Sequence, residues 1–284
     1  MAENPWLERR VFHWAHQGGA REGPSNTLYA MRRALDAGAH GLELDVHRTK
    51  DRKLVVAHDD ELRRTTGAGG RISTSTLDHL RTLDAAHQWV EGEVVVDGAP
   101  PERYPLRNDG PGPRTPDLGI PTLEEVLSRF PGVPLNLEIK RWRGALPLAK
   151  ALKALGRDDV IVVSIRPWAL WLFRLRAPGV RVAPSPVGLF AFWLASRVRF
   201  PLRFPASVAI QPPLRRKGKL FADRRLVDAA HKAGLAVHVW TLDDRAEIEQ
   251  AIDTGSDGIM TDRPTVLAAV LAERGVGWGG ATRE

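Results

Sequence analysis

Short apolar runs, many of them rich in β-branched residues, alternate along the chain with longer segments that carry apolar residues at positions i, i+3 and i+4. The runs predict strands at Val11–Ala15, Gly41–Val46, Leu54–Ala57, Leu135–Ile139, Val160–Ile165, Val180–Ala183, Val208–Ile210, Ala236–Trp240 and Gly258–Met260. The longer segments predict helices at Asn26–Ala37, Thr122–Phe130, Ala145–Leu155, Arg224–Ala233, Arg245–Thr254 and Thr265–Arg274. Strands that alternate with helices are typical of a parallel sheet. Because a helix also follows the last strand, this length favours a (β/α)8 TIM barrel of the α/β class over an open sheet.

One of the runs is more than an eight-stranded barrel needs, and Leu54–Ala57 is the run that fits a hairpin instead. Only about seven residues separate it from Val46, whereas a crossover between parallel strands needs about a dozen. We therefore expect a hairpin after the second strand, turning around 50–53, with opposing residue numbers that add to about 104. That pairing would place Asp45 across from residues near His58, so that their side chains gather at one edge.

The 284 residues are expected to form one domain over 1–284, without internal repeats. Residues 97–121 contain seven Pro and four Gly, so we expect a small irregular loop insertion at about 86–121. The Gly-rich tail from Gly275 is expected to be frayed. The chain has no Cys, which excludes disulfides and thiolate chemistry.

The first residues lack the basic and apolar regions of a signal peptide. No apolar run approaches the roughly 18 residues that a membrane-spanning helix needs. These two observations predict a cytoplasmic protein.

Positive charge is concentrated in one part of the sequence. Between Asp159 and Asp223 lie 63 residues without Asp or Glu, and they hold 11 of the 41 Lys and Arg residues. The formal net charge of +7 comes from this stretch, because the rest of the chain is net negative. A basic patch of this kind favours an anionic partner: a nucleic acid, an anionic membrane or a phosphate-bearing substrate.

Polar side chains stand at the ends of otherwise apolar strands. These residues are His16, Glu43, Asp45, His58, Glu138 and Lys140. Glu43 and Asp45 are two residues apart and so point to one face of their strand, and Glu138 and Lys140 repeat that spacing. Because the carboxyl ends of barrel strands converge on one rim, such residues are candidates for catalysis.

Three carboxylates on one rim repel one another unless a cation neutralises them. Oxygen ligands suit a hard divalent cation, so Mg²⁺ or Ca²⁺ is the natural choice. The imidazoles of His16 and His58 have an ordinary pKa near about 6.5 and suit general acid and base roles. Each of these features taken singly is more often structural or solvated. Together, on strands that are otherwise apolar, they favour a metal-assisted site.

A series of ordered motifs resembles the glycerophosphodiester phosphodiesterase family, which lies in the superfamily of barrel phosphodiesterases that includes phosphatidylinositol phospholipase C. In chain order the motifs are His16-Gln17-Gly18, Pro24-Ser25-Asn26-Thr27, Glu43-Leu44-Asp45-Val46, Thr49-Lys50-Asp51, His58-Asp59, Arg64-Thr65-Thr66-Gly67, Pro121-Thr122-Leu123-Glu124-Glu125, Leu137-Glu138-Ile139-Lys140, Val239-Trp240-Thr241 and Asp257-Gly258-Ile259-Met260-Thr261-Asp262-Arg263-Pro264. The resemblance runs from about residue 12 to residue 268.

The resemblance implies a metal-dependent phosphodiesterase that hydrolyses glycerophosphodiesters to an alcohol and glycerol 3-phosphate. In the family pattern Glu43, Asp45 and Glu138 would bind the divalent metal. His16 and His58 would form the acid–base pair, one deprotonating the nucleophile and the other protonating the leaving alcohol. Which histidine does which is left open.

The same resemblance assigns substrate-binding positions and exposes two departures. Lys140 would hold the phosphate, and Trp240 would line the glycerol side of the pocket. Where the family has Arg after the first His, Gln17 stands here, so a neutral hydrogen-bonding group replaces a bidentate cation. Where the family has Glu before Asn-Thr, Ser25 stands here and suits a helix cap. These changes argue for an altered headgroup or a weaker grip on phosphate.

Asp262, near the last strand, has two readings. It either caps the last helix together with Thr261 or lies at the rim, since Pro264 favours a first helical turn. The other histidines are expected to be structural or exposed, and His13 is a minor candidate for the site because it lies close to the first strand's end.

Three other functions compete with the first. A lysophospholipase D would keep the site and act on lysophospholipids, releasing the headgroup. A nucleic-acid-binding protein would use the basic patch but leaves the carboxylates and histidines unexplained, so no nucleic acid is expected. A catalytically inactive scaffold is disfavoured by the intact set of candidate ligands. The segment 197–204, which interleaves Arg with apolar residues, predicts peripheral contact with an anionic membrane from a loop near the active rim.

Overall fold

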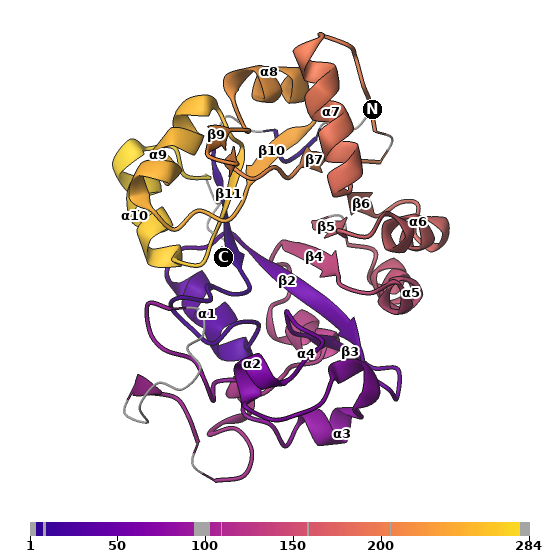
Figure 1. Ribbon diagram of the computed structural model, residues 1–284, viewed down its shortest axis with the longest axis vertical. Coiled ribbons are helices and arrows are strands. Elements are labelled where there is room, and N and C mark those ends of the chain that lie inside the picture. The colour runs from indigo at the N-terminus through magenta and orange to yellow at the C-terminus, as the bar shows by residue number, and fades with distance from the viewer. Residues whose placement is uncertain are drawn as a thin grey trace.

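The computed structural model describes residues 4–7, 10–93, 103–108, 110–157, 159–204 and 206–278. In this part of the chain eight parallel strands form the wall of a barrel in the order β6, β5, β4, β2, β1, β11, β10, β7 (Figure 1). Their bounds are β1 Phe12–His16, β2 Gly41–Arg48, β4 Leu135–Ile139, β5 Val160–Val163, β6 Arg181–Val182, β7 Ala209–Ile210, β10 Ala236–Val239 and β11 Gly258–Thr261. A parallel bridge between Val182 and Ser207 joins the first and last strands of that order. The expected (β/α)8 barrel is therefore confirmed.

The short strand β3 (Leu54–Val56) pairs antiparallel with β2 outside the barrel wall. Val46 faces Val56 and Arg48 faces Leu54, so opposing numbers add to 102 rather than about 104. The residue across from Asp45 is thus Ala57, whose N–H donates to the Asp45 carbonyl at 3.0 Å. His58 follows directly and is carried toward the same edge.

Eight of the helices in the described residues have seven or more residues. They are α1 Leu28–Asp36, α4 Leu123–Arg129, α5 Ala145–Leu155, α6 Pro167–Arg176, α7 Pro186–Arg197, α8 Arg224–Lys232, α9 Arg245–Thr254 and α10 Pro264–Arg274. Side chains cap several of their first turns, as a capping box of Thr122 and Glu125 does for α4. The expectation that Ser25 caps the first helix is wrong. Thr27 is the N-cap of α1 and accepts from the N–H of Ala30, because the helix begins two residues later than that cap would require.

Shorter elements lie in the segment after β3 and in the loops that follow β4 and β7. They are α2 Arg63–Thr66, α3 Leu77–Leu80, η1 Ile72–Thr74, η3 Pro116–Leu118, η4 Trp142–Gly144 and the hairpin strands β8 Arg215–Arg216 and β9 Lys219–Leu220. The segment after β3 has its own small core, in which Leu62, Ile72 and Leu80 pack on Val55. Part of the insertion expected at 86–121, residues 94–102 and 109, lies outside the described residues, as do the last residues of the tail, 279–284.

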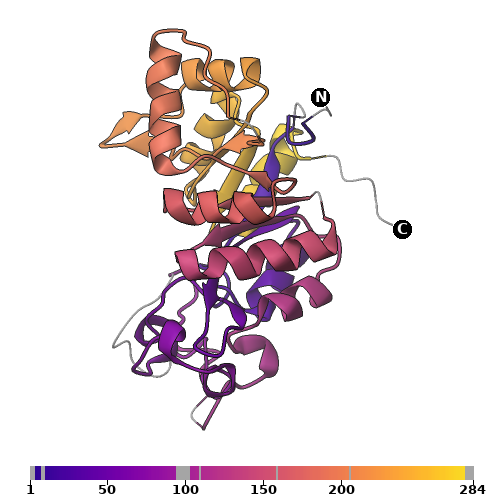
Figure 2. The same cartoon turned by 90° about the vertical axis from the view of Figure 1, so that its right-hand side faces the viewer.

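Helices α6 and α7 carry no matching sequence prediction. Both have apolar residues on nearly every side, so the alternation that marks a half-buried helix is missing. Their outward faces carry large apolar side chains, with Trp168 and Val187 among the most exposed. Figure 2 shows α7 standing upright while α5 and α6 lie across the view. No helix in the described residues is long and apolar enough to cross a membrane.

The barrel is filled below its carboxyl-terminal rim. Phe12 and Trp14 of β1 pack with Met260 and with Trp6, which closes the opposite end. Asn136 lies above them, fully buried. The polar groups at the rim therefore lie on a closely packed floor, where electrostatic interactions are strong.

Two buried histidines and one partly buried histidine make the fold sensitive to acid. Burial lowers the pKa of His238 and of His13 to about 3 and that of His40 to about 4. Unfolding returns each to about 6.5, so below that pH the unfolded chain binds more protons than the native state and stability falls. We expect the free energy of unfolding, measured in urea, to drop by about 1.4 kcal/mol per histidine for each pH unit below about 6.5.

A His238→Leu variant tests the cause of this acid sensitivity. In this variant the free energy of unfolding should depend less steeply on pH, by the equivalent of about one proton, because the removed imidazole no longer takes up a proton on unfolding. An unchanged slope between about pH 6.5 and 5 would show that these histidines are not its source.

Candidate active site

Three carboxylates meet at the carboxyl-terminal rim of the barrel. Glu43 and Asp45 lie on β2, and Glu138 lies on β4 directly beside Asp45 in the sheet register. One oxygen of each lies within 4.8 Å of the others. Glu43 and Asp45 are buried, and Glu138 is nearly so. The expectation that these three residues share one face of the site therefore matches the geometry.

Lys140 provides the cation closest to this cluster. Its Nζ lies 3.1 Å from the Asp45 Oδ1 and 3.1 Å from the Glu138 Oε2. Burial by itself would lower the pKa of Lys140, but Asp45 and Glu138 raise it above its usual value. Lys140 contacts Asp45 and Glu138, whereas the cationic partner of Glu43 is His16, whose Nε2 lies 3.8 Å from the Glu43 Oε2.

The donor set fits a divalent cation. Burial and the neighbouring Asp45 raise the pKa of Glu43 well above its usual value, so the site favours a proton or another cation there. The Glu138 Oε1 is buried and has no hydrogen-bond partner among the described residues. Carboxylate oxygens are the ligands that Mg²⁺ and Ca²⁺ prefer. The cluster can therefore hold one divalent metal ion.

Asn26 fixes the orientation of Asp45, a role that the sequence reading did not assign. Its Nδ2 donates to the Asp45 Oδ2 at 3.0 Å, and its Oδ1 accepts from the Asp45 N–H at 3.3 Å. Asn26 has a φ of +61°, a conformation that Asn adopts more readily than most residues. The paired amide leaves Oδ1 of Asp45 facing Lys140.

His16 ends β1 and lies between two carboxylates. Its Nδ1 is 2.7 Å from the Asp262 Oδ1, and its Nε2 is 3.8 Å from the Glu43 Oε2. Burial would lower its pKa, but Glu43 and Asp262 raise it to about 9. Of the two alternatives for Asp262, the rim position holds, because its side chain contacts His16, whereas Glu22 accepts from the Thr265 N–H at 3.2 Å in the first turn of α10. The sequence pointed to His16 and Asp262 separately but not to their contact, because the two residues lie 246 positions apart in the chain.

His58 follows β3 and approaches the cluster from the other side. Its Nδ1 lies 2.7 Å from the Asp59 Oδ1, and Arg64 in turn binds Asp59. Burial would raise the pKa of Asp45, but the charges of Lys140 and then of both histidines lower it. His16 and His58 thus flank the same carboxylate, each held through Nδ1 by an aspartate.

Gln17 and Trp240 lie at the same rim. The Gln17 N–H donates to the Glu43 Oε2 at 3.2 Å, and its buried Oε1 has no partner in the described part of the chain. Trp240 follows β10, is 44% exposed, and donates from its indole to the Gln211 carbonyl at 2.7 Å. Neither side chain hydrogen-bonds a carboxylate of the cluster among the residues described. His13 lies on β1 beside His40 and does not reach the cluster.

Comparison with known proteins identifies the family. The model of the glycerophosphoryl diester phosphodiesterase family matches residues 16–266. The chain is 31% identical over 271 residues to a glycerophosphodiester phosphodiesterase of Caldanaerobacter subterraneus, covering 92% of this chain and 98% of the relative. It is 28% identical to the human lysophospholipase D GDPD1, covering 91% of this chain and 85% of the relative.

A solved structure agrees with these relatives. The crystal structure of a glycerophosphodiester phosphodiesterase from Agrobacterium tumefaciens superposes with a TM-score of 0.68 at 26% identity, covering 91% of this chain and 99% of that one. The range matched by the family model, residues 16–266, includes the three rim carboxylates and both histidines. The chain belongs to the glycerophosphoryl diester phosphodiesterase family and is a phosphoric diester hydrolase.

Proposed function

We propose that this enzyme hydrolyses glycerophosphodiesters to an alcohol and glycerol 3-phosphate in a reaction that depends on a divalent metal ion. The observation that carries this proposal is the cluster of Glu43, Asp45 and Glu138, whose oxygens lie within 4.8 Å of one another on a packed floor, with Lys140 bound to two of them. The three carboxylates would hold Mg²⁺ or Ca²⁺. When bound, the cation would polarise the phosphoryl group and offset its negative charge.

His16 and His58 are proposed as the acid–base pair. One takes a proton from the nucleophile, which is water or a neighbouring hydroxyl of the glycerol moiety, and the other gives a proton to the leaving alcohol oxygen as the phosphorus–oxygen bond breaks. Asp262 and Asp59 each engage Nδ1 of a histidine, which leaves Nε2 of each ring for the substrate. The aspartates thereby fix the orientation of both rings.

Lys140, Gln17 and Trp240 are proposed to bind the substrate. Lys140 would stabilise the charge that builds on the phosphoryl oxygens, because its ammonium group already lies between two of the carboxylates. Gln17 would offer its free amide oxygen and NH₂ group to the polar part of the substrate. The half-exposed indole of Trp240 would cover the carbon skeleton of glycerol.

A product assay tests this function and separates it from a second candidate. The human relative is named a lysophospholipase D, and the exposed apolar face of α7 would suit a substrate with an acyl chain. Purified enzyme should be given glycerophosphocholine, glycerophosphoethanolamine and lysophosphatidylcholine side by side. Release of glycerol 3-phosphate from the first two supports the main proposal. Choline release from lysophosphatidylcholine alone favours the lysophospholipase D.

Changing Gln17 to Arg tests the departure from the family pattern. The Gln17 side chain is buried beside Glu43, so a larger guanidinium group would need space that the present packing does not provide. We expect kcat/KM for glycerophosphocholine to fall by about tenfold, or 1.4 kcal/mol of transition-state stabilisation. A lower KM with unchanged kcat would instead show that Gln17 is a weakened form of the family's phosphate donor.

Peripheral contact with an anionic membrane is proposed as well, through α7 rather than through the 197–204 segment as a whole. Arg197 belongs to α7 and makes two hydrogen bonds with Asp223, at 2.6 and 2.9 Å, so it is not free for lipid. Val187, Phe190 and Leu194 form an exposed apolar stripe along this helix.

Cations border that stripe. The hairpin of β8 and β9 projects beside α7 (Figure 2) and carries four exposed basic residues, Arg215, Arg216, Lys217 and Lys219. The Arg216 guanidinium lies 5.6 Å from the centre of the Phe190 ring. Apolar side chains bordered by cations suit an anionic lipid interface.

Vesicle binding tests this contact. Replacing Phe190 and Leu194 by Ser should weaken sedimentation with phosphatidylglycerol vesicles by about tenfold, because two apolar side chains no longer insert. The matched control replaces Leu155 and Leu175, equally exposed residues on α5 and α6, by Ser and should sediment like the native protein. Equal sedimentation of all three proteins would leave α7 as ordinary surface.

The single-domain organisation over 1–284 and a cytoplasmic location stay predictions.

A further inference from the structure

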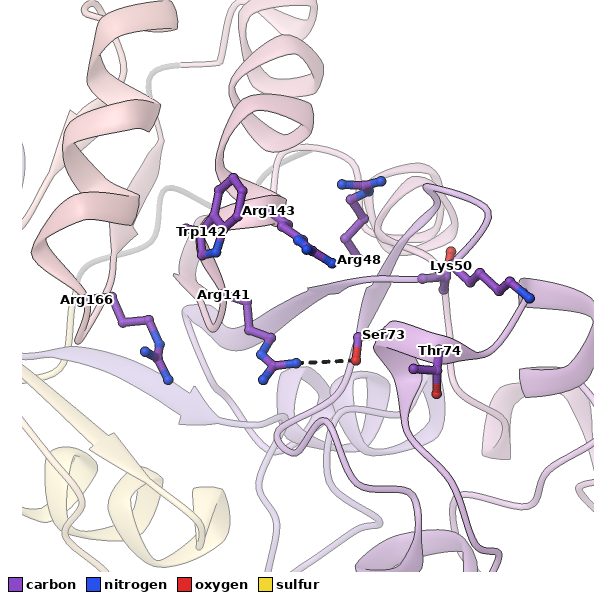
Figure 3. A pocket seen from close by; sticks show the side chains of 9 residues that line it. Arg48, Lys50, Ser73, Thr74, Arg141, Trp142, Arg143 and Arg166 are labelled. Carbon is purple, nitrogen blue, oxygen red and sulfur yellow. Dashed lines mark hydrogen bonds between the residues drawn. The ribbon is translucent and has the colours of Figure 1, made fainter.

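A basic pocket of about 520 Å³ opens on the rim beside the carboxylate cluster. Figure 3 shows the five cations and the indole that line it, which belong to Arg48, Lys50, Arg141, Trp142, Arg143 and Arg166. These residues lie at or just beyond the carboxyl ends of β2, β4 and β5, which are neighbours in the sheet. Arg141 follows Lys140 directly, and the Arg166 Nε donates to the Lys140 carbonyl at 3.2 Å. The pocket therefore adjoins the proposed phosphate-binding position.

The charge in this pocket is largely uncompensated. Arg141 binds Asp60 at 2.8 Å, but Arg48, Lys50 and Arg143 form no ion pair with any carboxylate of the described residues. None of the side chains that line the pocket is acidic. Like charges in a shared hollow repel, so an anion that enters the pocket lowers the free energy of the protein.

A second observation points to a ligand. The Nε of Arg48 is buried and has no hydrogen-bond partner among the described residues. Most buried polar groups are paired in native proteins, and a buried unpaired donor on a cation is costly. An anion with several acceptor oxygens would approach this guanidinium group from the pocket side.

We propose that this pocket, called the rim anion pocket below, binds a phosphate group other than the one that is cleaved. Arginine forks match phosphate oxygens in pairs, and Lys50 adds a flexible point charge. Trp142 is 56% exposed, and its indole offers a flat apolar surface to a ring that carries the phosphate. Such a phosphate can come from the headgroup of a soluble diester or from the headgroups of a membrane surface. The inference rests on the proposed function, because it extends the substrate side of that site.

Kinetics on soluble substrates test the first source. Glycerophosphoinositol and glycerophosphoinositol 4-phosphate differ only by the second phosphate. In an enzyme with Lys50→Gln and Arg143→Gln, we expect KM for the phosphorylated diester to rise about tenfold. The kcat and KM for the unphosphorylated diester should stay unchanged. The matched control carries Lys153→Gln and Arg174→Gln, exposed cations of α5 and α6 outside the pocket, and should behave like the native enzyme.

Vesicles test the second source with the same three proteins. Phosphatidylcholine vesicles are compared with phosphatidylcholine vesicles that contain phosphatidylinositol 4-phosphate. An effect on vesicle binding alone, about tenfold for the pocket variant and absent in the control, identifies a lipid surface as the source of the phosphate.

The two arms together can overturn the proposal. If the pocket variant and the control have the same KM for the phosphorylated diester and bind the vesicles equally well, the rim anion pocket binds no phosphate and its cations are solvated surface. Failure of the native enzyme on unphosphorylated glycerophosphoinositol and glycerophosphocholine would contradict the proposed function instead, and the vesicle arm would still report on the pocket.

Discussion

Replacing Asp45 by Asn, or Glu138 by Gln, is expected to lower the turnover of glycerophosphocholine by at least about 100-fold. Either change removes an anionic ligand from a cluster whose three carboxylates lie within 4.8 Å, while the side-chain volume stays almost the same. Asp45 matters doubly, because it is oriented by Asn26 and contacts Lys140. The measurement is steady-state release of glycerol 3-phosphate at saturating Mg²⁺ or Ca²⁺.

A matched control and a stability measurement separate lost chemistry from lost folding. Glu61→Gln neutralises an exposed carboxylate near the same rim that forms an ion pair with Arg71, and should keep native turnover. Thermal unfolding should show that both variants of the cluster fold as the native enzyme does. Near-native turnover of folded Asp45→Asn would remove that residue from the metal site.

Replacing either histidine of the proposed acid–base pair should also strongly reduce turnover. We expect His16→Ala and His58→Ala each to reduce kcat by about 100-fold or more, the usual effect of losing a positioned acid or base. His79→Ala is the matched control, because His79 is an exposed residue of α3 and is not part of the carboxylate cluster.

The pH dependence gives a separate readout of the pair. If one histidine works as an acid and the other as a base, the native enzyme shows a bell-shaped profile, and each variant loses one limb of it. A variant that keeps both limbs and most of its turnover would show that its missing histidine carries no proton in the reaction.

The barrel could be predicted from the sequence because its strands are nearly continuous apolar runs, as buried parallel strands must be. The prediction of Leu135–Ile139 coincides with β4, and Ala145–Leu155 with α5. Helices α6 and α7 were missed because their exposed faces are apolar too, and the 3.6-residue period cannot be read from a helix without a polar side. The feature that hid these helices is the same one that suggests contact with lipid.

The site was predicted in part. Residues that occupy strand ends, such as Glu43 and Glu138, follow from local spacing, because a side-chain period of two and a common rim suffice to bring them together. The residues that orient the site's side chains cannot be predicted from local spacing. Asn26 lies in a loop before α1, and Asp262 follows the last strand, so their contacts with Asp45 and His16 depend on how the whole barrel closes.

The hairpin shows the same limit on a smaller scale. Its existence followed from a connection too short for a crossover, but its register depends on which residues form the turn. Val46 pairs with Val56, and the tight turn includes Arg52 with a φ of +69°. Because the register differs by two residues from the expected one, Ala57 rather than Asp59 lies opposite Asp45.

The measurement that tests the central claim most directly is metal add-back to the native enzyme. Enzyme freed of divalent cations by a chelator is mixed with glycerophosphocholine, and glycerol 3-phosphate is followed as Mg²⁺ or Ca²⁺ is returned. A carboxylate cluster that works through a bound cation predicts no product before the addition and full turnover after it. Undiminished release of glycerol 3-phosphate in excess chelator would contradict the account.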